Sequence, residues 1–362
     1  GCAQTDKGWE VTLDATAFYP TGGGQACDLG MLGNAHVLDV TERGEEILHL
    51  CDAPLEVGKT VTGKIDWARR FDLMQQHTGE HIVSGIIHRL YGHQNSGFHV
   101  GEELMEVDFD GPLPEGALEE IQRLANEAVW ADLPVNCYVP SPEELPGVVY
   151  RTKRALPWPV RIVQVPGFDS CACCGTHVQA TGEIGLIKLF TVMGFRGGTR
   201  MEMACGAAAL KLLNAAYEQN RQVSQAFSAR IEETGAAARR MNEVEANLKY
   251  RIVGLEKRIF TGIAENCAGK GDVVHFEEGL DNVAVRDLAD AIAELCGGTA
   301  AVFSGSDEEG YAFCLVTRSG DLRQLGKEMT KALNGRGGGK PVFQQGRVQA
   351  TKTEIAAFFA AR

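Results

Sequence analysis

The chain has 362 residues, 44% of them hydrophobic, and a formal net charge of -13 at pH 7. A chain of this length and composition can bury at least two hydrophobic cores, so we expect two or three domains. The acidic balance argues against a protein that coats nucleic acid nonspecifically, because such binding depends on neutralising phosphates, although it allows a local RNA-binding surface.

The sequence predicts neither a membrane span nor a secretion signal. Uninterrupted apolar runs stay shorter than about 18 residues, and residues 1–7 lack a basic segment followed by an apolar stretch. Among the 11 cysteines, Cys171, Cys173 and Cys174 are too close in sequence for all of them to pair with one another in relaxed disulfides. We therefore expect reduced thiols, a soluble chain, no membrane partner and a cytoplasmic location.

Residues 1–68 are predicted to form a small β-barrel-like unit. Short apolar runs such as 11–13 and 36–40 alternate with turns rich in Gly and Asp. The unit begins abruptly, which suggests that a first strand is missing from the sequence.

Residues 69–205 have the pattern of an α+β domain. Apolar residues recur at helical spacings over 69–91, and a second helix is predicted over 114–131. Short strands alternate with turns after it, including 160–165 and 184–189.

Residues 206–261 are predicted to be a helical, coiled-coil linker. Proline is absent between 207 and 260, and glycine is sparse there. Apolar residues repeat at steps of three and four, at Met241, Val244, Leu248, Ile252, Leu255 and Ile259. One long helix or a helical hairpin broken near Gly235 fits this pattern, and the apolar seam could pair within the chain or join two chains in a homodimer.

Residues 262–362 are predicted to form a separate C-terminal α/β domain. The pattern favours a helix over 283–295 and buried strands over 300–303 and 313–316. Between 316 and 352 there are eight basic and two acidic residues, a net charge of +6. This excess favours an RNA-binding surface, although a solvated charged face gives the same pattern.

Two separate segments offer metal ligands. His77 and His81 lie four residues apart on the first predicted helix, so their side chains share one face. Nearly a hundred residues later, Cys173 and His177 supply a thiolate and a third imidazole. Nitrogen and sulfur donors of this kind suit zinc, so the sequence predicts a Zn2+ site built from both segments.

These motifs resemble the zinc editing site of the AlaX proteins and of the alanyl-tRNA synthetase editing domain. The resemblance spans about residues 9–205. It is carried by His77 to His81 (HxxxH), Cys173 to His177 (CxxxH), Gly22 to Gln25 (GGGQ), Phe18 to Thr21 and Arg200 to Glu202.

The C-terminal part also resembles the synthetase. Residues 335–341 are similar to the glycine-rich segment of the domain that follows editing in alanyl-tRNA synthetase. That domain, preceded by a coiled coil, distinguishes the long form of AlaX. The chain therefore resembles a long-form AlaX trans-editing protein over nearly its full length.

The resemblance implies a hydrolase that deacylates tRNA(Ala) mischarged with serine or glycine, with Zn2+ as the cofactor. The candidate catalytic residues are Glu80, Gln25 and Thr21. Glu80, next to a ligand, is a candidate general base toward water. Glycines that allow close backbone approach and two cations that suit RNA phosphates are the candidate substrate-binding residues: Gly22, Gly23, Gly24, Gly97, Arg336 and Lys340.

The chain departs from the family pattern around these residues. Many relatives have Gly where Cys174 stands, and Cys171 adds another thiol, so either cysteine could replace Cys173 as the ligand. Glu80 stands where Thr often precedes the second His, and Gly97 stands where Gln is common. These differences leave the preferred amino acid open.

Two alternative functions are compatible with parts of the pattern. His77 to His81 also fits the HxxEH motif of inverzincin metallopeptidases, but Cys173 and His177 disfavour that class because they would close its open metal position. A noncatalytic tRNA-binding protein with structural zinc is the second alternative, since four nitrogen and sulfur ligands also suit a structural site.

Overall fold

The structure is a computed structural model and describes residues 1–100, 104–152 and 156–362. These residues form two compact units, 1–223 and 224–362. Helices and several sheets make up the chain, which confirms the α+β class expected from the sequence. None of the helices in the described ranges is long and apolar enough to cross a membrane.

The first sheet of unit 1 has six antiparallel strands in the order β1-β2-β5-β4-β3-β6. The strands are β1 (Cys2–Thr5), β2 (Gly8–Thr12), β3 (Gly30–Leu32), β4 (Ala35–Arg43), β5 (Glu46–Cys51) and β6 (Gly63–Ile65). Within the described residues β1 and β6 remain the two open edges, so the predicted barrel-like closure is wrong. The last strand is only three residues long, and the chain leaves the sheet directly after it to start a helix.

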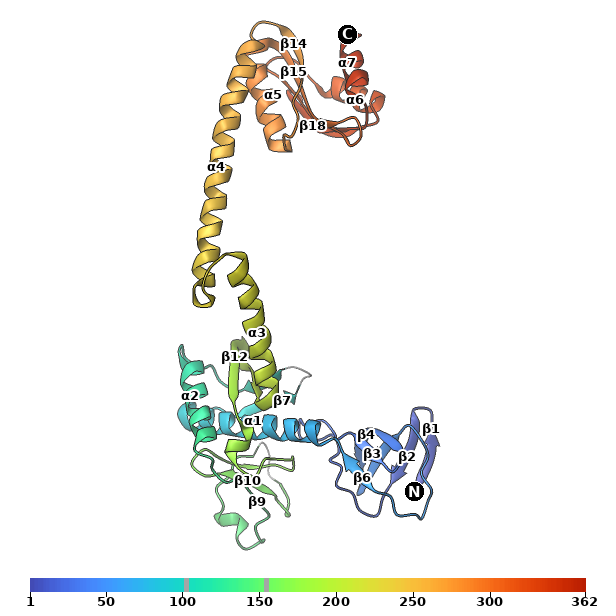
Figure 1. Cartoon of the computed structure of the whole chain (residues 1–362), viewed down its shortest axis with the longest axis vertical. Helices are drawn as coiled ribbons and strands as arrows, with labels where there is room; N and C mark the ends of the chain where they lie inside the picture. The colour runs from blue at the N-terminus through green and yellow to red at the C-terminus, as the bar shows by residue number, and fades with distance from the viewer. Residues whose placement is uncertain (101–103, 153–155) are drawn as a thin grey trace. The chain divides into compact units, whose positions relative to one another are not determined.

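Helix α1 (Trp67–Tyr91) carries the chain from this sheet into the rest of unit 1 (Figure 1). The Asp66 side chain caps its N-terminus by accepting from the Arg69 N–H, and Gly92 ends it in the left-handed conformation. The helix predicted over 69–91 is therefore confirmed, with two more residues at its start.

Helix α1 is buried all round along its middle, where residues 75–87 are all buried. Two glycines allow this close packing: a Cβ at Gly79 would lie 2.2 Å from the Cys205 Sγ, and one at Gly85 would lie 2.3 Å from the Phe168 carbonyl oxygen. A surface helix buries only an apolar stripe. This one buries polar side chains as well, including both histidines of the HxxxH motif.

Two further sheets and helix α2 (Ala117–Trp130) complete this part of unit 1. One sheet is ordered β12-β13-β8-β7 and the other β11-β10-β9, all antiparallel. Their strands are β7 (Asn95–Val100), β8 (Met105–Phe109), β9 (Asn136–Tyr138), β10 (Ile162–Val165), β11 (Asp169–Ala172), β12 (Ile187–Phe195) and β13 (Gly198–Cys205), with short 3-10 turns η1 (Leu145–Gly147) and η2 (Thr181–Ile184).

The predictions for this region are mostly confirmed. The second helix and the strand expected at 160–165 are present as α2 and β10. The strand expected over 184–189 begins only at Ile187, because Ile184 ends the η2 turn and Gly185 takes a positive φ of 77°.

The predicted long helix is interrupted. Helix α3 (Gly206–Ala226) ends before the short turn η3 (Ile231–Glu233), and α4 (Thr234–Asn266) follows. The break lies just before Gly235, where one of the two alternatives placed it, and the hairpin itself stays a prediction. The repeating apolar residues of α4, from Met241 to Ile259, are each between 49% and 57% exposed.

Unit 2 contains a five-stranded sheet in the order β14-β15-β16-β18-β17. Only the β14–β15 pair is parallel. The elements that follow α4 in unit 2 are β14 (Gly271–Phe276), α5 (Asn282–Cys296), β15 (Gly297–Ser306), β16 (Gly310–Thr317), α6 (Arg323–Ala332), β17 (Arg336–Lys340), β18 (Phe343–Val348) and α7 (Lys352–Ala360). The predicted helix 283–295 and strands 300–303 and 313–316 are confirmed, and two apolar clusters form the core of the unit.

Candidate metal centre

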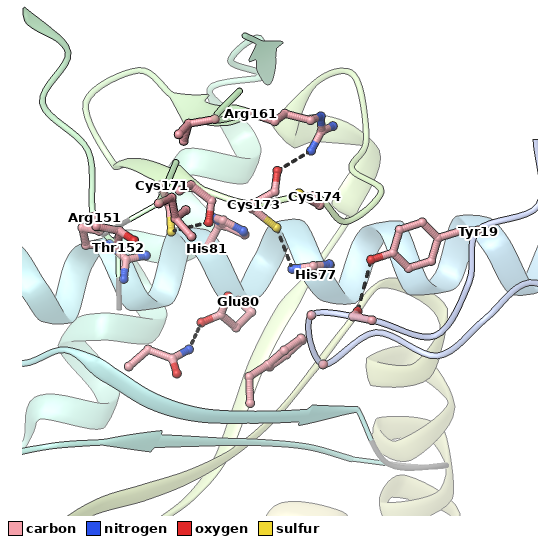
Figure 2. Close-up of a pocket in the computed structure, with 18 of the residues that line it drawn as sticks. Tyr19, His77, Glu80, His81, Arg151, Thr152, Arg161, Cys171, Cys173 and Cys174 are labelled. Carbon is pink, nitrogen blue, oxygen red and sulfur yellow. Dashed lines mark hydrogen bonds between the residues drawn. The ribbon is translucent and has the colours of Figure 1, made fainter. Parts of the chain in front are cut away.

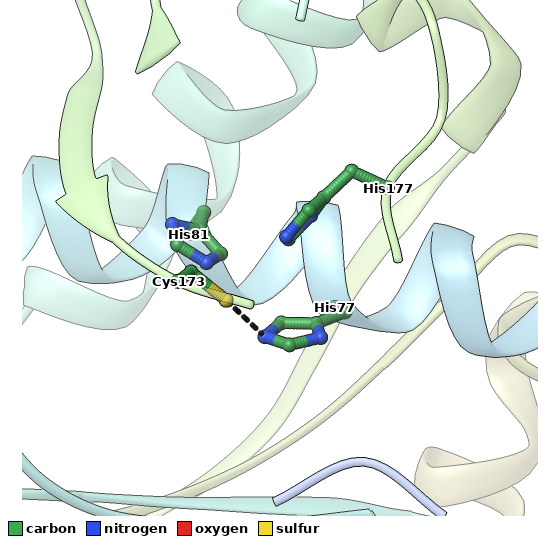
Figure 3. Close-up of side chains that lie close together, drawn as sticks. All are labelled: His77, His81, Cys173 and His177. Carbon is green, nitrogen blue, oxygen red and sulfur yellow. Dashed lines mark hydrogen bonds between the residues drawn. The ribbon is translucent and has the colours of Figure 1, made fainter. Parts of the chain in front are cut away.

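Four side chains from the two predicted segments converge at one point (Figure 3). His77 and His81 come from α1, and Cys173 and His177 come from the segment after β11. Their potential ligand atoms all lie within 4.8 Å of one another. No more than 8% of each of the three histidines is exposed. Three nitrogens and one sulfur at this spacing form a group that could hold a metal ion.

His77 is held from behind by Gln25. The Gln25 Oε1 lies 2.8 Å from His77 Nδ1 and also accepts from the Thr176 N–H at 3.1 Å. Because an amide oxygen only accepts, Nδ1 carries the proton and Nε2 keeps its lone pair, facing the Cys173 Sγ at 3.4 Å. Gly175 allows this arrangement, since a Cβ there would lie 2.2 Å from His77 Cε1.

His81 is held by a buried ion pair. Its Nδ1 lies 3.0 Å from Asp169 Oδ2, and Arg151 donates to both oxygens of the same carboxylate at 2.6 and 2.8 Å. Burial alone would raise the pKa of Asp169, but hydrogen bonds from His81 and Arg151 hold it below its usual value. Burial would lower the pKa of His81, yet the Asp169 carboxylate raises it well above its usual value.

His177 offers an unpaired nitrogen to the cluster. The Thr78 hydroxyl donates to the Met74 carbonyl and accepts from the Val178 N–H, so it can only accept from His177 Nδ1, 3.3 Å away. That leaves Nε2 unprotonated, and this buried atom has no hydrogen-bond partner in the described chain. Burial lowers the pKa of His177 to about 3, and the positive charge of His81 acts in the same direction.

The thiol at the centre is Cys173. Burial would raise the pKa of this thiol, but the surrounding imidazoles of His177, His77 and His81 outweigh burial and lower the pKa to about 2, which favours the thiolate. The Gly175 N–H also donates to its Sγ at 3.3 Å. Thiolate character is what metal binding requires of a cysteine.

The other two thiols are placed differently. Cys171 lies with His81 and Asp169 in a second group that could hold a metal, but burial raises the pKa of its thiol. Cys174 is exposed and belongs to neither group. Cys173 is therefore the one of these three cysteines that lies in the cluster with all three histidines.

A cavity of about 1070 Å³ opens beside the cluster. Candidate residues from distant parts of the chain line it, namely Thr21, Gly22, Gly23, Gly24, His77, Glu80, His81 and Cys173. Gly24 has a φ of 85°, and a Cβ there would lie 2.3 Å from the Phe98 ring, so the glycine loop passes directly over that ring. Phe98 in turn lies against His77, with ring centroids 5.2 Å apart.

Glu80 points from α1 toward the strands and away from Cys173 (Figure 2). The carboxylate is buried, and the Ser84 hydroxyl and the Asn95 side-chain amide both donate to its Oε1. No hydrogen bond reaches Oε2 from the described residues. One carboxylate oxygen is thus fixed, while the other accepts no hydrogen bond within the described ranges.

Two candidate residues lie outside the cavity wall. Gln25 is 1% exposed and lies behind His77. Gly97 sits at an irregularity of β7, where a Cβ would lie 3.1 Å from Asp108 Oδ2. Asp169, Arg151 and Asn95, in contrast, are site residues that the sequence patterns missed.

Arg336 and Lys340 belong to unit 2, where both are exposed at the ends of β17. Their segment is a strand paired with β18 and not a loose glycine loop. Two basic residues of the same region, Arg318 and Arg323, form ion pairs with acidic neighbours. Within the described ranges, Arg336 and Lys340 form none.

Comparison with known proteins defines the class. Residues 160–203 match the threonyl and alanyl tRNA synthetase second additional domain, residues 2–69 match class II (A) tRNA synthetases, and residues 269–361 match the DHHA1 domain. This combination of matches and the buried histidine and cysteine cluster define a protein related to alanyl-tRNA synthetase.

Relatives that match nearly the whole of this chain narrow the class of protein further. The alanyl-tRNA editing protein Aarsd1-A of Xenopus laevis is 30% identical over 96% of this chain and 86% of its own length, and Aarsd1 of Danio rerio is 27% identical over 95% and 85%. An alanine-tRNA ligase of Thermofilum pendens is 32% identical over 95% of this chain but only 40% of its own length. The chain belongs to the family of alanyl-tRNA editing proteins.

Proposed function

We propose that this chain is a trans-editing hydrolase that deacylates tRNA(Ala) mischarged with serine or glycine. Membership in the family supports the class of reaction, and it favours editing over the metallopeptidase alternative. The observation that carries the proposal is the convergence of three imidazoles and one thiolate beside a cavity of about 1070 Å³. A cavity of this size suits an aminoacyl group with its adenosine.

We propose Zn2+ as the ion, with His77, His81, Cys173 and His177 as its ligands. The fit rests on the donor set and on the His177 Nε2, a buried lone pair that lacks a partner in the described chain. When bound, the ion supplies positive charge that polarises the ester carbonyl. Four protein ligands would leave the ion no open position for water, so an orienting and polarising role is favoured over generating hydroxide.

The residues around the ion have distinct proposed roles. Gln25 positions His77, and the glycine loop 22–24 receives the terminal adenosine and aminoacyl group through its backbone. Thr21 is the proposed contact to a serine hydroxyl. Glu80 is the proposed general base, because it lines the cavity and is held in place through its Oε1.

Unit 2 is proposed to bind the body of the tRNA. Arg336 and Lys340 suit phosphates because they are exposed and lack carboxylate partners in the described chain. Helix α6 packs beside β17 and adds Lys327 and Lys331, which likewise form no ion pair among the described residues. The proposed domains remain 1–68, 69–205, a coiled-coil linker 206–261 and 262–362.

We also propose a homodimer that forms through the helical and C-terminal regions. The exposed apolar residues of α4 repeat at helical spacing, and pairing with a second helix would remove them from water. Light scattering should then give twice the chain mass. A monomer at micromolar concentration would contradict this part of the proposal.

The test is deacylation of seryl-, glycyl- and alanyl-tRNA(Ala) by the full chain, with and without a chelator. The first two should be hydrolysed and the correctly charged alanyl-tRNA spared, and chelation should stop turnover. Cys173→Ser should lose activity, whereas Cys137→Ser, at an exposed thiol outside the cavity, should not. A zinc-containing chain that binds tRNA but hydrolyses none of the three would instead support the noncatalytic alternative.

A further inference from the structure

A second cavity, of about 480 Å³, adjoins the first one. The two share Gln94, Arg151 and Thr152 as lining residues. Arg89 and Phe168 line the second cavity, and the glycine loop 22–24 does not. No residue of the sequence motifs lines it either. Its volume falls within the roughly 300–1000 Å³ of small-ligand sites.

The charge in this second cavity is positive. Arg89 lines it, and within the described residues no carboxylate pairs with its guanidinium. The only acidic lining residue is Asp169, which is 8% exposed and already bonded to His81 and Arg151. The cationic charge of Arg89 is therefore available to an anion.

Arg89 is also held in place. It donates to the Gly167 carbonyl oxygen at 2.7 Å, and its guanidinium carbon lies 5.6 Å from the centre of the Phe168 ring. A guanidinium has five N–H donors, so one bond to a carbonyl leaves several for a phosphate. Fixing the side chain in advance reduces the entropy lost on binding.

His88 adds a hydrogen-bond donor to the same wall. The Gln94 side-chain amide donates to its Nδ1 at 3.1 Å, so Nδ1 acts as the acceptor and Nε2 carries the proton. Two aromatic side chains, Tyr150 and Phe168, line the cavity as well. A fixed cation, a hydrogen-bond donor and aromatic rings are the features that bind single-stranded nucleic acid.

We propose that the second cavity binds the single-stranded nucleotides that precede the terminal adenosine of the charged RNA, with Arg89 contacting a phosphate. This inference rests on the proposed function and assigns the adjoining cavity to the same substrate. The terminal aminoacyl-adenosine occupies the first cavity, and the strand continues past the shared residues into the second. Unit 1 would then recognise short RNA ends as well as intact tRNA.

The test compares 3'-seryl-adenosine with a seryl-CCA trinucleotide as substrates for the full chain. Arg89→Gln should raise the KM for the trinucleotide about tenfold and leave the nucleoside ester unchanged, since only the longer substrate reaches the second cavity. The salt dependence of trinucleotide binding should also fall by about one unit of slope. Arg89→Lys should recover part of the loss.

Arg123→Gln is the matched control, because this arginine is exposed, paired with Glu127 on α2 and outside both cavities. The inference is overturned if Arg89→Gln affects both substrates equally or neither. Hydrolysis of neither substrate by the unmodified chain would be a different result, since it would contradict the proposed function itself.

Discussion

Replacing Gly175 by Ala tests the packing that holds His77. The residue is not in the left-handed region, so Ala can adopt the same backbone, and the effect is steric alone. The new Cβ would lie 2.2 Å from His77 Cε1 and 3.1 Å from Gln25 Oε1. Ordinary contacts begin at 3.4 Å, so the ring must move by 3.4 minus 2.2, or 1.2 Å.

That displacement is large for a metal ligand. Ligand distances in metal sites are held to within about 0.2 Å, so the ring must leave its position or the segment around residue 175 must shift. Losing the Gln25 contact to Nδ1 alone is expected to weaken metal binding about 10- to 100-fold, which corresponds to about 1.4 to 2.8 kcal/mol.

The assay is competition for zinc between the protein and a chromogenic chelator of known affinity. Gly194→Ala is the control, because no atom lies within 4 Å of a Cβ at that position and its φ is also not left-handed. The control should bind zinc as the unmodified chain does. If Gly175→Ala binds zinc within twofold of the unmodified chain, the reasoning about His77 is refuted.

Further predictions concern catalysis, pH and RNA binding. Glu80→Gln should abolish deacylation with zinc content unchanged, and retained turnover would remove Glu80 as the base. Hydrogen bonds from Arg200 hold the pKa of Asp108 below its ordinary 3.8, so this pair stabilises the fold above pH 3.8 and its contribution is lost as the pH falls through the lower folded value. Asp108→Asn should therefore flatten the loss of unfolding free energy below pH 3.8 in denaturant titrations, and an unchanged profile would contradict this. Lys340→Glu should weaken tRNA binding and reduce its salt dependence, whereas equal affinity would argue against unit 2 as the tRNA-binding part.

The sequence predicted the elements better than the contacts between them. Helix α1 follows from its apolar spacing, and the zinc-ligand chemistry of the two segments, supported by the resemblance, predicted that its two histidines meet Cys173 and His177. The sequence does not predict the hydrogen bond between Gln25 and His77, because residues more than fifty positions apart meet only through the tertiary fold.

The sequence also failed to predict strand β17, the open form of the first sheet and the ion pair between Asp169 and Arg151. The glycines of 335–339 have low strand propensity, yet pairing with β18 makes most of this segment an edge strand. The barrel-like expectation for 1–68 followed from alternating short strands, which open and closed sheets share. The Asp169 and Arg151 pair has no periodic pattern, since a buried ion pair depends on where its two segments meet.

The central claim is that three histidines and one cysteine bind a single ion. X-ray absorption spectroscopy of the zinc-loaded full chain tests it most directly. The account predicts one sulfur at about 2.3 Å and three nitrogens at about 2.0 to 2.1 Å, with the sulfur lost in Cys173→Ser. A zinc shell without sulfur, or one with sulfur that persists in that variant, would contradict it.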